Sequence, residues 1–202
     1  LIKGIKHVPF GDSAAMKRAI TKKTAMVIVE PIMGEAGVIV PPSDYLKNLR
    51  QYCDDNGALL DFDCVQTGMG RTGDWFGYEY SGIKPDVITL AKGLGGGLPL
   101  GAMIALGSAS QLFEAGDHGS TFGGNPVATA AALAVISSIE KGKILAHVDE
   151  VGEFLLAELA LIPGVTEVRG AGLLIGLTLE KPVAKKLSKR CQELGALINA
   201  PG

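Results

Sequence analysis

Three side chains that can do acid, base or nucleophilic chemistry stand at the ends of short apolar runs. They are Glu30, Asp63 and Lys92. Runs of this length predict buried strands, and ligands of open α/β sheets bind just beyond the carboxyl ends of such strands. One lysine or aspartate after a strand is usually a solvated charge or a turn residue. The order of all three, rather than any one of them, therefore predicts a single crevice lined by two acids and an amine.

Helical segments must alternate with these strands to position the three residues. We expect strands at residues 25–30, buried on both faces, and at 58–63, 86–91 and 101–106. The helix signals between them are Asp12 or Ser13 as an N-cap, Asn56-Gly57 as a C-terminal stop, and Asn125-Pro126 as N-cap and first helical residue. This alternation predicts an α/β fold with a mostly parallel sheet.

A change of composition near Lys141-Gly142-Lys143 predicts a domain boundary. Beyond it we expect helices at about 147–161 and 183–194 and strands at 166–169, 173–179 and 196–199. This set describes a small α+β unit. We therefore expect two domains, residues 1–142 and residues 143–202.

Composition excludes several kinds of partner. The net charge is -2, which gives no reason to expect nucleic acid as a ligand, and no apolar run approaches the roughly 18 residues of a membrane helix. Three unpatterned cysteines, Cys53, Cys64 and Cys191, favour a reducing, cytoplasmic compartment without a metal site. Because the chain starts without Met and stops just after an expected strand, we expect it to be part of a longer protein.

Four segments carry the strongest signal. They are Glu30-Pro-Ile-Met-Gly-Glu-Ala-Gly37, Asp63-Cys-Val-Gln-Thr-Gly-Met-Gly-Arg-Thr-Gly73, Thr89-Leu-Ala-Lys-Gly-Leu-Gly-Gly-Gly-Leu-Pro99 and His118-Gly-Ser-Thr-Phe-Gly-Gly-Asn-Pro126. In order and spacing they resemble the signature motifs of the class III, or ornithine-type, aminotransferases that use pyridoxal 5'-phosphate (PLP). The resemblance covers essentially the whole chain.

The resemblance implies a fold and a cofactor. The fold is that of type I PLP-dependent transferases, a mostly parallel sheet with helices on both faces and a small C-terminal α+β domain. Lys92 matches the residue that binds the PLP aldehyde, and its amine suits proton transfer once it is neutral. Asp63 matches the carboxylate that keeps the ring nitrogen protonated, so that the ring acts as an electron sink.

Other cofactor contacts are implied by the same resemblance. Val65 matches an apolar residue on one face of the ring, and Gln66 matches a donor to the ring hydroxyl oxygen. Cys64 belongs to this cofactor segment but stands where the family has glutamate. Thr121 matches a residue that reaches the PLP phosphate of the other subunit, which implies a homodimer.

Two further positions are implied to face the substrates, an amino acid and a 2-oxo acid. Ser120 matches a residue near the substrate. Glu35 matches an acid that pairs with an arginine, expected beyond residue 202, and gates the binding of carboxylates.

Asp61 is a second departure from the family, which has an apolar residue there. Strand side chains alternate, so Asp61 and Asp63 share one face while Cys64 points to the other. Two carboxylates this close should raise one another's pKa. We therefore expect that Asp61 finds a cation or donors, or that the strand is distorted.

The implied reaction transfers the terminal amino group of N-acetylornithine to 2-oxoglutarate, giving N-acetylglutamate semialdehyde and glutamate, a step of arginine biosynthesis. Ornithine, succinylornithine and 4-aminobutyrate remain alternative donors within the class. Two remote alternatives are an inactive scaffold and an NAD-dependent oxidoreductase, because Gly68-Met-Gly-Arg-Thr-Gly73 fits a dinucleotide fingerprint. We expect residues 1–202 alone to be inactive.

Overall fold

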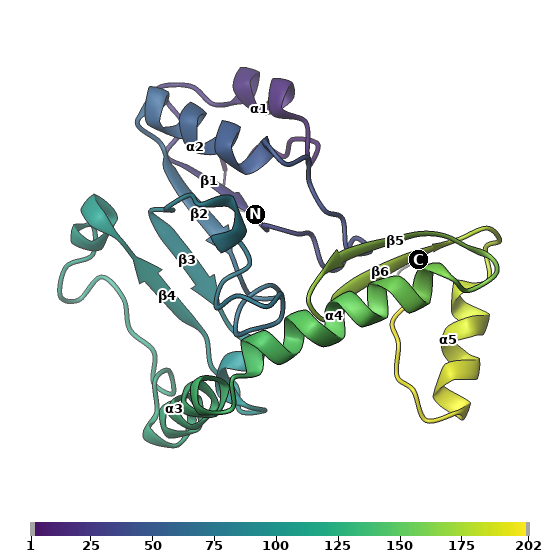
Figure 1. Ribbon diagram of the computed structural model, residues 1–202. Helices are drawn as coiled ribbons and strands as arrows, with labels where there is room; N and C mark the ends of the chain where they lie inside the picture. Colours follow the sequence, from purple (N-terminus) through teal and green to yellow (C-terminus); the bar gives the residue numbers. More distant parts are fainter. Residues whose placement is uncertain (1–2, 201–202) are drawn as a thin grey trace.

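Four strands form the main sheet of the computed structural model, which describes residues 3–200 (Figure 1). Residues 1–2 and 201–202, the outer ends of the two predicted domains, lie outside the described residues. The strands are β1 (Met26–Val29), β2 (Leu59–Asp63), β3 (Val87–Leu90) and β4 (Ala102–Ala105), in that spatial order. β1, β2 and β3 are parallel, and β4 runs antiparallel to β3. The predicted α/β fold with a mostly parallel sheet is confirmed.

Two helices cover one face of this sheet (Figure 1). Helix α1 (Ser13–Ala19) begins where the Asp12 side chain accepts a hydrogen bond from the Ala15 N–H, and α2 (Tyr45–Asn56) ends at Gly57, whose φ of 71° is left-handed. Leu49 of α2 and Phe62 of β2 are both fully buried in the core between these layers. The core therefore fixes which face of β2 points inward.

The opposite face of the sheet is exposed along its two outer strands among residues 3–200, whereas Asp61 and Val87 at its centre are buried. Ile28 is 62% exposed, and Met26 and Met103 are also exposed. The expectation that residues 25–30 are buried on both faces is therefore wrong. β1 is an edge strand here, and only its inward residues pack against the helices. The expected helices on the second face stay a prediction.

Short 3-10 helices connect the outer elements. They are η1 (Glu79–Ser81), η2 (Lys92–Gly95) and η3 (Gly107–Gln111). Helix α3 (Pro126–Lys141) starts as predicted, with the Asn125 side chain accepting from the Ala128 N–H and Pro126 as the first helical residue. α3 packs against η2 so closely that a Cβ on Gly96 would lie 2.8 Å from Val135 Cγ2.

A second, two-stranded sheet lies apart from the first (Figure 1). Strands β5 (Val165–Ala171) and β6 (Leu174–Leu179) are antiparallel, and α4 (Ile144–Ala160) packs on β5 before α5 (Ala184–Glu193) follows. The predicted boundary at 142/143 falls between α3 and α4 and stays a prediction. No helix within residues 3–200 has the length and apolar character to cross a membrane.

The expected strand at 196–199 is wrong, because these residues are not paired with β5 or β6. The Ala196 N–H donates to the Cys191 carbonyl, and Ser188 Oγ donates to the Ile198 carbonyl at 2.8 Å. The segment therefore returns along α5, and its backbone polar groups are partly satisfied there rather than in a sheet.

Candidate active site

The carboxyl ends of the three parallel strands meet at one edge of the sheet. Asp63 of β2 is paired with Thr89 of β3, and the Cys64 N–H donates to the Thr89 carbonyl at 2.9 Å. On the other side, Val29 of β1 is paired with Phe62, which puts Glu30 level with Asp63. Parallel pairing thus collects the chemically active side chains at one edge, since all three strands end there.

The Asp63 carboxylate is half-buried and held in place by its own turn. Its Oδ1 accepts a hydrogen bond of 3.0 Å from the Val65 N–H. An aspartate that bonds the backbone two residues ahead fixes both its rotamer and the following turn. The carboxylate is therefore oriented before any ligand arrives.

Lys92 has a backbone conformation that favours a functional interpretation. Its φ is 47°, in the left-handed region that non-glycine residues rarely occupy, and its side chain is exposed. The turn is held by the Leu94 N–H, which donates to the Ala91 carbonyl at 3.0 Å. Such strained residues cluster at binding and catalytic sites. The turn places Lys92 two residues after the last residue of β3.

Glu35 and Gln66 approach one another at the same edge. Gln66 Nε2 donates to Glu35 Oε1 at 3.4 Å, a long bond, and the Gly34 N–H donates to Glu30 Oε2 at 3.0 Å. A Cβ on Gly34 would lie only 2.5 Å from the end of the Gln66 side chain, so a larger residue at position 34 would displace the Gln66 amide from its present place. The end of β1 and the end of β2 are thereby joined through side chains predicted to contact cofactor and substrate.

Asp61 is buried without an ion-pair partner among the described residues. It is 4% exposed, and its Oδ1 has no hydrogen-bond partner there. Burial, and then the nearby charge of Asp63, raise the pKa of Asp61 to about 6. β2 keeps a regular register through this position, so the expectation of a cation, donors or a distorted strand is wrong. The carboxyl group instead becomes easier to protonate.

Cys64 lies on the face of β2 opposite to Asp63, as strand alternation predicts. Its thiol is part of the core and 1% exposed, and burial raises its pKa to about 12. Its place among the cofactor-binding residues remains a prediction from the resemblance, because its side chain packs in the core.

Ser120 and Thr121 are not brought to the other site residues by this single chain. Both are exposed in the loop before α3, and Ser120 Oγ accepts a hydrogen bond of 3.0 Å from the Gly123 N–H. Neither hydroxyl bonds to Asp63 or Lys92 within residues 3–200. Their predicted roles need a ligand or a second subunit.

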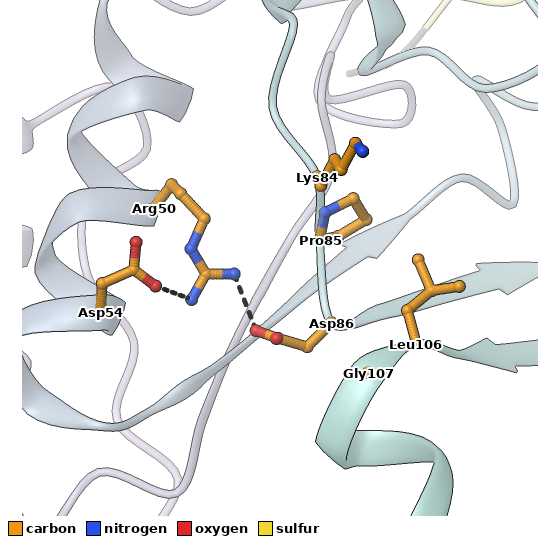
Figure 2. Close-up of a pocket in the computed structure, with 7 residues that line it drawn as sticks. All are labelled: Arg50, Asp54, Lys84, Pro85, Asp86, Leu106 and Gly107. Atoms are coloured by element: carbon orange, nitrogen blue, oxygen red, sulfur yellow. Dashed lines mark hydrogen bonds and ion pairs between the residues drawn. The ribbon is translucent and has the colours of Figure 1, made fainter.

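A hollow of about 440 Å³ lies at the other end of β3 and does not contain the predicted site (Figure 2). There Arg50 bridges Asp54 and Asp86, each at 2.7 Å, and Asp86 also accepts from the Leu60 N–H. Asp86 precedes β3 whereas Lys92 follows it. The network ties α2 to the start of β3, which is a structural role.

The glycines at 68–73 do not form a dinucleotide site. A dinucleotide fingerprint opens a helix whose N-terminus binds the pyrophosphate. Here turns follow the glycines up to the short η1, and the Met69 N–H donates to the Trp75 carbonyl. The NAD-dependent alternative therefore lacks the helix N-terminus that would bind the pyrophosphate.

Arg169 contacts the site loop and was missed by the sequence analysis. Its guanidinium donates to the backbone carbonyls of Val38 and Gly37, in the loop that carries Glu35. Arg169 is 131 residues from Val38 along the chain and belongs to none of the motifs. No spacing rule connects residues this far apart, so the sequence held no usable signal for the contact.

Comparison with known proteins gives a consistent result. The family model described as Aminotransferase class-III matches residues 10–202. An acetylornithine aminotransferase of Streptomyces coelicolor is 52% identical over 200 residues, covering 98% of this chain and 50% of the relative. One of Mycolicibacterium smegmatis is 49% identical over 199 residues, covering 97% of this chain and 51% of the relative. The chain spans about half the length of the curated relatives it matches.

Solved structures agree with these relatives. An ornithine aminotransferase of Toxoplasma gondii, described with partial occupancy of PLP at its active site, matches with a TM-score of 0.92 and 30% identity. The match covers 99% of this chain and 49% of that one. An acetylornithine aminotransferase of Elizabethkingia anophelis matches with a TM-score of 0.88 and 33% identity, over 96% of this chain and 51% of that one.

Proposed function

The chain belongs to the class III aminotransferases, and on that basis we propose that the full-length protein transfers the terminal amino group of N-acetylornithine to 2-oxoglutarate. The products are N-acetylglutamate semialdehyde and glutamate. The observation that carries the proposal is the meeting of the β2 and β3 ends, where Asp63 pairs with Thr89 and Lys92 follows on a strained turn. An acid and an amine are thereby held at neighbouring strand ends.

These residues fit PLP as the cofactor. An aldehyde needs a primary amine, which Lys92 offers on an exposed side chain, and a pyridine nitrogen needs a carboxylate, which Asp63 offers in an oriented form. When bound, PLP supplies an electron-withdrawing ring that stabilises the negative charge left on the substrate carbon after a proton departs. Val65 would pack on one face of the ring, and Gln66 would donate to the ring hydroxyl oxygen.

Lys92 and Asp63 divide the proton chemistry between them. With PLP bound, the Lys92 amine would act as the base that takes the proton from the substrate carbon at Nζ and would later return it. The Asp63 carboxylate would accept a hydrogen bond from the protonated ring nitrogen and would hold the proton at that atom. Because Val65 already fixes the Asp63 carboxylate, this contact needs little reorganisation during the reaction.

The remaining predicted residues act on the substrates and on a second subunit. We propose a homodimer in which the exposed Thr121 contacts the PLP phosphate of the neighbouring subunit, with Ser120 near the substrate. Glu35, which is exposed and bonded to Gln66, controls the entry of substrate carboxylates. The cysteines Cys53, Cys64 and Cys191 are all free thiols, which is consistent with the proposed cytoplasmic location.

A donor panel tests the choice of substrate. The 52% identity to an acetylornithine aminotransferase favours N-acetylornithine over ornithine, the substrate named for the 30% identical Toxoplasma structure. We expect the full-length enzyme with PLP and 2-oxoglutarate to form glutamate from N-acetylornithine with a larger kcat/KM than from ornithine, succinylornithine or 4-aminobutyrate. A larger kcat/KM for any of the other three would reassign the donor and keep the family.

A further inference from the structure

The loop that carries Glu35 is a narrow hairpin. Met33 and Ile39 form an antiparallel bridge, with the Met33 N–H donating at 3.0 Å and the Ile39 N–H at 2.9 Å to each other's carbonyl. Val38 lies in the left-handed region at φ 56°, which a β-branched side chain disfavours. A loop with such a residue keeps its conformation only if the surrounding structure holds it. We call residues 33–39 the Glu35 loop.

One side of the Glu35 loop is held by the main sheet. The Gly34 N–H donates to Glu30 Oε2, and Gln66 packs over Gly34 and reaches Glu35. These contacts leave the strained half of the hairpin, Gly37 and Val38, to be supported by other residues.

The other side of the Glu35 loop is held by Arg169 of β5. Arg169 Nε donates to the Val38 carbonyl at 2.8 Å, and Nη2 donates to the Gly37 carbonyl at 2.6 Å. Nη1 is occupied by Glu167 Oε2 at 3.0 Å and Thr178 Oγ1 at 2.7 Å. A guanidinium with bonds on all three nitrogens has little freedom to move, since its fork is planar and rigid.

Strand β6 packs closely against Gly37 and Val38 as well. A Cβ on Gly176 would lie 2.8 Å from the Gly37 carbonyl oxygen and 2.8 Å from Val38 Cβ. Gly176 pairs with Arg169 across the β5–β6 ladder, so both contacts come from one point of the two-stranded sheet. The second sheet therefore supports the loop through a charged donor and a close backbone approach.

We propose that Arg169 is a positioning residue that sets the place of the Glu35 carboxylate and thereby the affinity for the amine donor. The inference rests on the proposed role of Glu35 in admitting substrate carboxylates. None of the hydrogen bonds of the Arg169 side chain within residues 3–200 goes to Asp63 or Lys92, so Arg169 affects binding more than the chemical step. Through it, the β5–β6 unit takes part in substrate selection.

Arg169→Met in the full-length holoenzyme removes the donors and keeps much of the side-chain volume. We expect the KM for N-acetylornithine to rise about tenfold, since two charge-assisted hydrogen bonds are lost, while kcat changes less than about threefold. Hydrogen exchange should become faster in residues 33–39 but not in α2. Arg169→Lys should recover part of the KM, because an ammonium can serve one carbonyl. Arg190→Met, at an exposed arginine that forms an ion pair with Glu193, is the matched control and should leave the KM and the hydrogen exchange of residues 33–39 unchanged.

A second variant keeps the test decisive if Arg169→Met does not fold. Gly176→Ala adds a methyl group on β6 that would clash with Gly37 and Val38 of the same loop, and it removes no charge. We expect the same rise in the KM for N-acetylornithine. An unchanged KM in the folded Arg169 variant, or in Gly176→Ala if that variant is the one that folds, overturns the proposal. So does a fall in kcat and PLP content without a change in KM. If the unaltered enzyme makes no glutamate from N-acetylornithine, the proposed function fails, and the exchange rate of residues 33–39 alone decides whether Arg169 holds the loop.

Discussion

Asp63 and Thr89 are paired across β2 and β3, and this pairing sets the Asp63 carboxylate beside the turn that carries Lys92. Two residues, Leu90 and Ala91, separate Thr89 from Lys92, and Ala91 leads into the left-handed turn. The relationship depends only on parallel strand pairing, which the buried core beneath Phe62 enforces.

Lys92→Ala should abolish the attachment of PLP and lower turnover by at least about a thousandfold, since both the nucleophile and the proton carrier are lost. Visible absorbance after addition of PLP measures the attachment, and glutamate formation measures the turnover. Lys84→Ala is the matched control, because Lys84 is exposed and precedes β3 instead of following it. Near-normal turnover in the Lys92→Ala variant would contradict the assignment of Lys92 as the residue that binds PLP.

Asp61 should make the enzyme less stable as the pH rises. Its folded-state pKa of about 6 lies above the ordinary value of 3.8, so the folded state binds the proton more tightly. The stabilisation is fully present below pH 3.8 and is lost as the pH rises through 6. Ionisation therefore costs about 2 to 3 kcal/mol of folding free energy at pH 8.

Asp61→Asn tests this pH dependence. It removes the titrating group with little change of shape, so the variant should be more stable than the parent at pH 8 and similar to it near pH 4. Unfolding midpoints in urea at the two pH values provide the measurement. Asp55→Asn, at an exposed aspartate in α2, is the control. Equal pH responses of Asp61→Asn and the parent would show that Asp61 does not titrate in this range.

The three thiols should differ sharply in reactivity. Burial raises the pKa of Cys53 to about 11 and that of Cys64 to about 12, and both thiols are buried, whereas Cys191 is partly exposed. Only thiolates react quickly with iodoacetamide. At pH 8 in the native enzyme we expect Cys191 to be alkylated first, with Cys53 and Cys64 labelled only after denaturant is added. Labelling of Cys64 as fast as Cys191 would contradict its position in the core.

Mixed dimers test the proposed sharing of the site between subunits. If Thr121 serves the PLP bound to the other subunit's Lys92, a dimer of one Lys92→Ala and one Thr121→Ala chain contains one intact site and one doubly damaged site. Random mixing of the two inactive or weak variants should then restore about a quarter of the parent activity. Mixing that restores no activity, with heterodimers verified by mass, would show that Thr121 acts within its own subunit.

Local features of the fold could be predicted from the sequence. Asp12, Gly57 and Asn125 act as helix ends because capping depends on a few neighbouring residues. Asp63 ends one strand and Lys92 lies just beyond another, because short apolar runs were recognisable in the sequence. The exposed face of β1 was not predictable, since a run of apolar residues does not say whether a strand is central or at an edge. The run at 196–199 likewise had strand composition but no partner strand.

The pKa of Asp61 and the contact between Arg169 and the Glu35 loop could not be predicted from the sequence and became visible only in the structure. Asp61 was expected to find a cation or donors, or to distort the strand, because an unpaired buried charge is costly, yet the rise of its pKa offers protonation as the alternative. Arg169 lies in a different sheet from the loop it binds, and only folding brings the two together.

Borohydride reduction followed by peptide mapping tests the central claim most directly. The full-length enzyme is incubated with PLP, reduced, digested and analysed by mass spectrometry, with and without prior addition of N-acetylornithine alone. We predict that the phosphopyridoxyl mass appears on the peptide containing Lys92, and that prior N-acetylornithine prevents it, because the donor takes the cofactor off the lysine and no 2-oxoglutarate is present to return it. A label on another lysine, no label at all, or a Lys92 label that N-acetylornithine leaves unchanged would contradict the account.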